Sequence, residues 1–207
     1  MALPVAEPFA DKTSVRKEAL VVDMHPVHET KSGHFSTFTG AKVSLQSPKA
    51  SSIKINDIAH ALSNLCRFGG HTRYFYSVAQ HSILVAKLAK LNGENREIQL
   101  AALMHDATEA YVQDLIKPLK NMVAEPYDVI EARFEAVIAQ KFGIKLEHFA
   151  TVKQYDRAAL EIEHEYLMVG KDRARFMQFF SSGAVDPPFA EIAFLGQFKQ
   201  LIIKKSS

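Results

Sequence analysis

The chain has 207 residues, of which 47% are apolar and 23% charged, and its formal net charge is +2. These proportions are those of an ordinary globular protein, so we expect a sizeable core and neither a disordered nor a membrane-spanning chain. The balanced charge argues against a nucleic-acid polymer or an anionic membrane as partner. It does not exclude a small anion, because a local cluster of positive charge needs no global excess.

Cysteine and histidine usage narrows the expectation further. Cys66 is the single cysteine, so no intramolecular disulfide and no cysteine-based zinc module is available, which fits a reducing cytoplasm. No run reaches the roughly 18 apolar residues of a membrane span, and the first residues lack the order of a signal peptide. A cytoplasmic protein is therefore expected. The nine histidines stand out, because histidine titrates near neutrality and is the commonest metal ligand.

Two regions are expected along the chain, residues 1–52 and residues 53–207. The first contains several prolines and glycines and a Ser/Thr-rich stretch, which is typical of a mostly irregular N-terminal arm. Within it, the segment HFSTFTGAKVSLQ alternates around Gly40 in a way that is compatible with a short β-hairpin.

From residue 55 onward, apolar residues recur at helical spacing, with no internal repeat and no alternation of strands and helices. Caps and breakers divide this region into about six helices. Their expected bounds are 55 to the Gly69-Gly70 break, 77–91, 96–112, 126–143, 151–166 and 186–202. The expected fold class is therefore an all-α bundle.

Two histidines, His81 and His105, occupy core-facing positions of these helices. A buried, hydrogen-bonded histidine explains either one alone. However, Asp106 follows His105 directly, and Asp156 lies among apolar neighbours in the fifth helix. Two histidines and two aspartates on three inward-facing stretches are costly to bury unless they meet a cation. This set of donors suits a first-row divalent ion and leaves room for water.

Three segments carry a resemblance to a known family, namely RFGGHTRYFYSVAQHS at 67–82, LMHDATEAYVQDLIKPLK at 103–120 and YDRAALEIEHE at 155–165. They resemble the HD-domain metal-dependent phosphohydrolases over roughly residues 55–170. More narrowly, they are similar to the bacterial and phage 5′-deoxynucleotidase-like branch, which includes phage enzymes that remove triphosphate from dATP.

The ordered H…HD…D signature of that family is matched by four residues, His81, His105, Asp106 and Asp156. The resemblance implies that these four bind a divalent metal ion, with Co, Mn, Zn, Ni and Mg as candidates. It also implies that residues 53–207 form a helical bundle of the HD type.

Two acidic residues are candidates for catalysis. Glu109 follows His105 by four residues, so a continuous helix would place it one turn along the same face, near a metal-bound water. The resemblance implies that Glu109 orients or activates that nucleophile, or passes a proton to the leaving oxygen. The alternative is a solvated glutamate or an ion pair at the helix end. Asp114 matches a second acidic position of the family's active site, and otherwise it would be a turn aspartate.

Arg67 and Phe68 match the arginine–aromatic pair of the deoxynucleotidases, in which the arginine contacts phosphate and the ring packs on the sugar. Arg67 would also neutralise charge that develops on the phosphate during hydrolysis. The deoxynucleotidases often have tryptophan at the aromatic position, and this chain has no tryptophan.

Further polar residues lie near the same segments. His71, Arg73 and Lys117 are candidates for contacts with phosphates beyond the first, although charged loop residues are usually only solvated. His60 and Asn64 follow the helical spacing of Arg67, so they either line the same cleft or face solvent.

The activity implied by the resemblance is metal-dependent hydrolysis of the 5′-phosphoester of a 2′-deoxynucleotide. A monophosphate would yield deoxynucleoside and phosphate, whereas a triphosphate such as dATP would yield triphosphate, and the motifs do not separate the two. The alternatives are a cyclic or alarmone nucleotide phosphodiesterase and a non-catalytic nucleotide sensor on the same scaffold. The expected partner is a small-molecule deoxynucleotide, and a homo-oligomer is expected because family members commonly self-associate.

Overall fold

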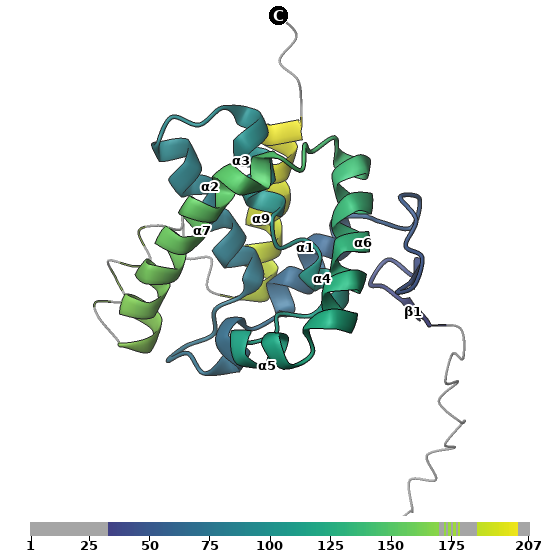
Figure 1. Cartoon of the computed structure of the whole chain (residues 1–207). Helices are drawn as coiled ribbons and strands as arrows, with labels where there is room; N and C mark the ends of the chain where they lie inside the picture. The colour runs from purple at the N-terminus through teal and green to yellow at the C-terminus, as the bar shows by residue number, and fades with distance from the viewer. Residues whose placement is uncertain are drawn as a thin grey trace, which may run out of the picture. The chain divides into compact units, whose positions relative to one another are not determined.

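The structure, a computed structural model, describes residues 33–169 and 186–202, and between them residues 172, 174, 176 and 178. This part of the chain is mostly helical, with one small antiparallel sheet on its N-terminal side (Figure 1). The expected helical fold with a short hairpin in the arm is therefore confirmed. The remainder of the predicted arm, residues 1–32, lies outside the described residues. No helix in the described ranges is long and apolar enough to cross a membrane.

Two short strands precede a series of helices along the chain. In order, the elements are β1 His34–Ser36, β2 Lys42–Ser44, α1 Ile55–Asn64, η1 Arg67–Gly70, α2 Val78–Leu91, α3 Arg96–Met104, α4 Glu109–Val112, α5 Lys117–Met122, α6 Ala124–Phe142, α7 His148–Glu163, η2 His164–Met168 and α9 Pro187–Ile202. Of these, η1 is a 3₁₀ helix and η2 is a π-helical continuation of α7.

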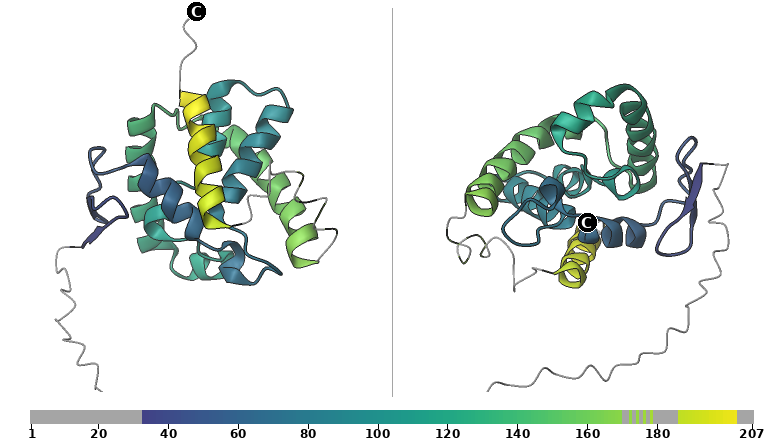
Figure 2. Two further views of the ribbon diagram at one scale, coloured as in Figure 1. Left: turned by 180° about the vertical axis from the view of Figure 1, so that it is seen from behind. Right: turned by 90° about the horizontal axis from the view of Figure 1, so that it is seen from below.

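Helix α2 lies at the centre of the bundle and contacts α1, α3, α7 and α9. Val78, Leu84 and Val85 on this helix are fully buried. Its first turn is closed by a capping box, in which the side chains of Ser77 and Gln80 accept each other's backbone N–H groups. Seen from behind, α9 covers one side of α2 and α3, while α7 lies on the other side (Figure 2).

The hairpin β1–β2 is joined to α1 through a buried carboxylate. Strand pairing places Phe35 opposite Val43. Asp57, in the first turn of α1, accepts hydrogen bonds from Thr37 Oγ1 at 2.7 Å, from the backbone N–H of Thr39 at 2.7 Å and from Thr39 Oγ1 at 2.9 Å. Asp57 is only 3% exposed, so these bonds are shielded from water and fix the hairpin turn on the helix.

The predicted helix over residues 96–112 is wrong in one respect, because it breaks at the HD dipeptide. Helix α3 ends at Met104 and α4 starts at Glu109. Between them, the backbone N–H of Ala107 donates to the carbonyl of Met104, and the N–H of Glu109 donates to the carbonyl of Asp106, each at 3.0 Å. Both bonds span three residues instead of the four of an α-helix. His105 Nδ1 bonds to Ala102 O at 2.8 Å, and this carbonyl is the one that a continuous helix would offer to the N–H of Asp106. The imidazole therefore competes with the helix at this point.

The other predicted helices differ from the structure at their ends. The first ends at Asn64, because Leu65 is extended, and Arg67 lies in the separate helix η1. The fourth begins at Ala124 and the fifth at His148, each a little earlier than expected. Helix α5 forms where a loop was expected.

Replacement of the hairpin-binding carboxylate tests this part of the fold. Asp57→Ala leaves the donors of Thr37 and Thr39 without their buried acceptor, so we expect the free energy of unfolding to fall by about 2–3 kcal/mol. Urea denaturation measures the change, with Asp128→Ala at an exposed position of α6 as the control. Equal stability of the two variants would contradict the role of Asp57.

Candidate metal centre

Donor atoms of four predicted site residues, contributed by α2, α7 and the turn after α3, converge. His81 Nε2 lies 3.2 Å from His105 Nε2, 3.5 Å from Asp106 Oδ2 and 3.1 Å from Asp156 Oδ1. His105 Nε2 lies 3.2 Å from Asp106 Oδ2 and 3.9 Å from Asp156 Oδ1. Donors about 2.1 Å from one ion lie about 3–3.5 Å apart at octahedral or tetrahedral angles. His81, His105 and Asp106 thus form a cluster that could hold a metal ion, with Asp156 beside it.

Each imidazole of this cluster is oriented by an acceptor on its outer nitrogen. His81 Nδ1 lies 2.6 Å from Glu163 Oε1, and His105 Nδ1 lies 2.8 Å from the carbonyl of Ala102. When Nδ1 carries the proton in each of these bonds, both Nε2 atoms face the cluster with a free lone pair. This is the arrangement that metal-binding histidines commonly adopt.

Glu163 is a site residue that was not predicted from the sequence. Its side chain is fully buried at the end of α7, where it accepts hydrogen bonds from Tyr76 at 2.9 Å and from Arg67 Nη2 at 3.2 Å besides its bond to His81. The available signal was its spacing, because Glu163 follows Asp156 by seven residues and lies two turns along the same face of the helix.

A short antiparallel pairing brings Arg67 to the cluster. A β-bridge joins Cys66 to Ser77, and the N–H of Arg67 donates to the carbonyl of Tyr76 at 2.9 Å, directly before α2 begins. The Arg67 Nη1 atom lies 3.7 Å from Asp106 Oδ2 and 3.9 Å from Asp114 Oδ2. Burial alone would lower the pKa of Arg67, but the surrounding carboxylates, led by Glu163, raise it above its ordinary value. The guanidinium therefore stays charged.

The backbone is strained next to Arg67 and next to Asp114. Phe68 and Gln113 have positive φ angles of 55° and 73°, which non-glycine residues rarely adopt. Phe68 is followed by Gly69 and Gly70, also at positive φ, so the chain turns sharply after Arg67. Gln113 directly precedes Asp114. Strained backbone of this kind commonly occurs at functional sites, where the surrounding structure holds it in place.

Glu109 and Asp114 bring buried oxygen atoms close to Arg67. Glu109 Oε2, Asp114 Oδ2 and Arg67 Nε are buried and have no hydrogen-bond partner in the described structure. Burial, together with the nearby carboxylates of Asp106 and Asp114, raises the pKa of Glu109 well above its ordinary value. Burial also raises the pKa of Asp114. Because buried polar atoms normally have partners, these three fit a site that receives water or a polar ligand.

The charges in the cluster are strongly coupled. Burial raises the pKa of Asp106, but His105, His81 and Arg67 lower it to below its usual range. Burial also raises the pKa of Asp156, but its bond to His81 outweighs this effect and the pKa is lowered. Burial and Arg67 lower the pKa of His81, but Glu163 and Asp156 outweigh them and raise it to about 9. A metal ion that binds here must therefore displace a proton from His81.

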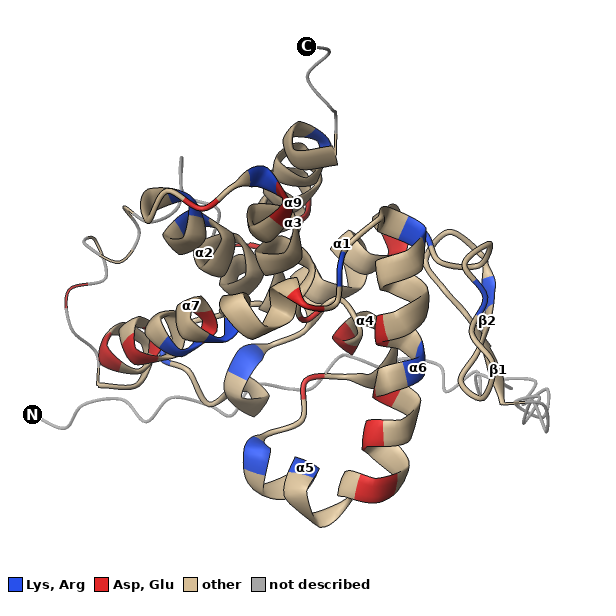
Figure 3. Cartoon of the chain, turned by 45° about the horizontal axis from the view of Figure 1, so that its top comes forward, with Lys and Arg blue, Asp and Glu red and all other residues tan. Residues whose placement is uncertain are grey.

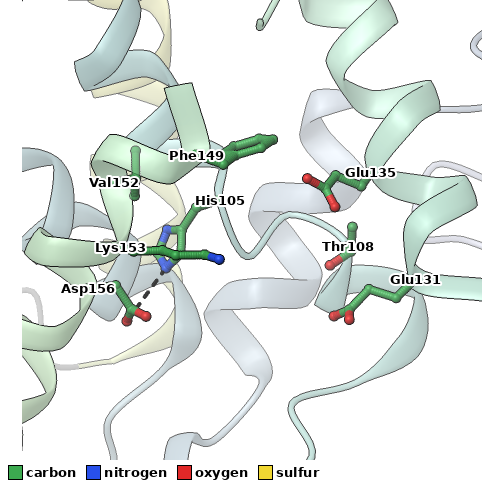
Figure 4. A pocket seen from close by; sticks show the side chains of 8 residues that line it. All are labelled: His105, Thr108, Glu131, Glu135, Phe149, Val152, Lys153 and Asp156. Carbon is green, nitrogen blue, oxygen red and sulfur yellow. Dashed lines mark ion pairs between the residues drawn. The ribbon is translucent and has the colours of Figure 1, made fainter. Parts of the chain in front are cut away.

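A pocket of about 220 Å³ opens beside the cluster, between α6 and α7 (Figure 4). It is lined by His105, Thr108, Glu131, Glu135, Phe149, Val152, Lys153 and Asp156. Two proposed metal ligands are therefore part of its wall. The other six residues were not predicted to share a site, because their separation in the chain gives no sign that they meet.

The predicted phosphate contacts lie away from this pocket. His71, Arg73 and Lys117 are exposed, and none of them lines it. Arg73 donates through Nε to the carbonyl of Met168 at 3.3 Å and so fixes the end of η2. His71 and Ile116, the residue before Lys117, both lie close to Gly69 of η1. A Cβ atom added at Gly69 would be 3.7 Å from His71 Cδ2 and 3.7 Å from Ile116 Cγ2. Phe68 lies with its ring centroid 5.3 Å from the Arg67 guanidinium and does not line the pocket either.

The expected common face of His60, Asn64 and Arg67 is wrong, because α1 ends before Arg67. His60 instead pairs with Glu191 of α9 at 3.0 Å. The Asn64 side chain donates to the carbonyl of His60 at 2.8 Å.

Weakening the outer bond of His81 tests the candidate centre. Glu163→Gln keeps the shape of the side chain but removes the charge that holds His81 and Arg67, so Mn²⁺ affinity should fall by roughly 10- to 100-fold. Isothermal titration calorimetry measures the affinity, with circular dichroism to confirm folding. Glu161→Gln, at an exposed position of the same helix, should bind Mn²⁺ like the unaltered protein. Unchanged affinity of a folded Glu163→Gln protein would contradict this account.

Comparison with known proteins gives relatives but no family model, since no such model matches the chain. The chain is 42% identical over 131 residues to the uncharacterized protein YfdR of Escherichia coli (strain K12), a match that covers 63% of this chain and 70% of YfdR. It is 38% identical over 125 residues to an uncharacterized protein of Rhodobacter capsulatus, covering 58% of this chain and 64% of that protein. The chain therefore belongs to the same family as YfdR.

Proposed function

We propose that this protein is a metal-dependent phosphohydrolase of the HD type that hydrolyses the 5′-phosphoester of 2′-deoxynucleotides. The observation that carries the proposal is the convergence of four donors, from His81, His105, Asp106 and Asp156, beside a buried arginine. A metal centre and a fixed guanidinium close to one another are what hydrolysis of a phosphate ester requires. The ordered sequence motifs are the reason for choosing the deoxynucleotide class.

The donor set fits a divalent ion, which when bound would polarise a phosphate oxygen and lower the pKa of a coordinated water. Arg67 is held by Glu163 through Nη2 and lies with Nη1 3.7 Å from Asp106, so a phosphate that reaches the donors also meets the guanidinium. A planar guanidinium can bind two phosphoryl oxygens at once. Arg67 therefore binds and orients the phosphate and neutralises its charge.

Glu109 is the residue best suited to move a proton. Its pKa is raised by burial and by the neighbouring carboxylates, so it can hold a proton under conditions in which an exposed glutamate cannot. Its buried Oε2 has no partner among the described side chains, which leaves it available to a water or to the leaving oxygen. Asp114 Oδ2 lies 3.9 Å from Arg67 Nη1 and limits the positions that the guanidinium can take.

The number of phosphates on the substrate depends on space beyond Arg67. His71 and Ile116, the residue before α5, both lie close to Gly69 of η1, so His71 and Lys117 remain the candidate contacts for a longer phosphate chain. Arg73 contributes less to this argument, because its side chain bonds to the end of η2. We include both monophosphates and triphosphates in the proposed substrate class.

The direct test is a panel of deoxy- and ribonucleotides with one, two or three phosphates, incubated with Mn²⁺-supplemented protein and resolved by chromatography. We expect release of phosphate or triphosphate from deoxynucleotides. Glu109→Gln should reduce the rate by about 10²- to 10⁴-fold, because proton transfer is lost while the four donors remain.

Two controls make this panel decisive. Glu125→Gln, at an exposed position of α6, should hydrolyse the same substrates at the unaltered rate. Mn²⁺ content of the Glu109→Gln protein should stay unchanged, and its loss would instead make Glu109 a metal ligand. A metal-loaded protein that cleaves no deoxynucleotide would overturn the proposal and favour a nucleotide sensor.

A further inference from the structure

The pocket beside the metal centre has two walls of different chemistry (Figure 4). Phe149 and Val152 on α7 form an apolar wall next to His105. Glu135 and Glu131 on α6 lie on the opposite side, near Thr108. The volume of about 220 Å³ is below the roughly 300–1,000 Å³ typical of pockets for whole drug-sized ligands. The pocket therefore suits a single ring system better than a complete nucleotide.

Glu135 is the acceptor that this pocket offers to a ligand. Both carboxylate oxygens of Glu131 already bind Lys120, at 2.9 and 2.7 Å. Glu135 makes no hydrogen bond or ion pair with any residue that the structure describes, although it is partly buried and lines the pocket. A partly buried carboxylate is stabilised by a ligand that donates hydrogen bonds to it.

The charge of this wall also excludes one class of occupant. Figure 3 shows acidic residues along α6 and basic residues on α5. Three carboxylates, those of Glu131, Glu135 and Asp156, line the pocket, and the one lysine among the described lining residues, Lys153, is exposed. Phosphates beyond the first would be repelled here, so the nucleoside end of a substrate is the better fit.

We propose that this pocket binds the nucleobase of the substrate and selects bases that carry an exocyclic amino group, namely adenine, cytosine and guanine, over thymine and uracil. A carboxylate only accepts hydrogen bonds, so Glu135 matches an amino N–H. The single N–H of thymine lies between two carbonyl oxygens, which a carboxylate repels. The flat ring would pack on Phe149 and Val152.

This inference rests on the proposed function for the position of the phosphate. His105 and Asp156 belong both to the donor cluster and to the pocket wall. A nucleotide whose phosphate meets the donors can therefore extend its base into the pocket that Glu135 lines. Base selection can nevertheless be measured without hydrolysis, because a nucleoside has no phosphate to cleave.

The test is isothermal titration calorimetry of the full chain, loaded with Mn²⁺, against 2′-deoxyadenosine, 2′-deoxycytidine, 2′-deoxyguanosine and thymidine. We expect the three amino-bearing nucleosides to bind about tenfold more tightly than thymidine, the effect of one hydrogen bond to a charged group. Glu135→Gln should reduce this preference to less than about threefold, because an amide both donates and accepts. Glu125→Gln on the same helix should keep it, and thermal unfolding should show that both variants are folded.

The outcomes separate this inference from the proposed function. Equal binding of all four nucleosides, or an unchanged preference in Glu135→Gln, would overturn the base selection. Deoxynucleotide hydrolysis without nucleoside binding would also overturn it, while leaving the proposed activity intact. Conversely, a Glu135-dependent preference in a protein that hydrolyses no deoxynucleotide would support the pocket assignment and contradict the activity.

Discussion

The candidate site depends on one buried carboxylate, that of Glu163. Burying a charge destabilises a fold unless the charge is paired and hydrogen-bonded. Glu163 is hydrogen-bonded to His81, Tyr76 and Arg67. The same carboxylate therefore sets the orientation of the imidazole that we propose as a metal ligand and of the guanidinium that would hold phosphate. The distance between the two functions is fixed by a single side chain at the end of α7.

The remaining charges around this carboxylate are unbalanced in a way that a divalent cation relieves. Asp106, Glu109 and Asp114 surround Arg67, and the burial of Glu109, together with the charges of Asp106 and Asp114, raises the pKa of Glu109. One guanidinium cannot neutralise all of them. A divalent ion at the donor cluster would supply the missing positive charge, and the substrate phosphate would then be held between the ion and Arg67.

The sequence identified the elements that carry regular patterns. The helical region was predictable because its apolar spacing and its helix caps indicate the same elements. The set from His81 to Asp156 was predictable because these residues follow one another in the order of the H…HD…D signature. Glu163 was not, because a glutamate in a charged stretch of helix resembles a solvated residue until the packing of α7 against α2 is known. The break at His105 was also hidden, since no glycine or proline marks it and its cause is a side-chain bond to Ala102.

The pocket illustrates a second limit of sequence reasoning. Glu135 and Val152 come from different helices, and only the positions of α6 and α7 bring them to the two walls of one cavity. Spacing within a helix says nothing about such pairs. Only the positions of the two helices in space show that the carboxylate of Glu135 faces the apolar wall of the pocket.

The proposed activity requires that one metal ion is bound by His81, His105, Asp106 and Asp156. Anomalous diffraction from crystals grown with Mn²⁺ tests it directly. We expect a peak about 2.0–2.3 Å from both Nε2 atoms and from one oxygen of each aspartate, the usual distances for such ligands. A map with no peak at this cluster at saturating Mn²⁺, or with one bound instead by other residues, would contradict it.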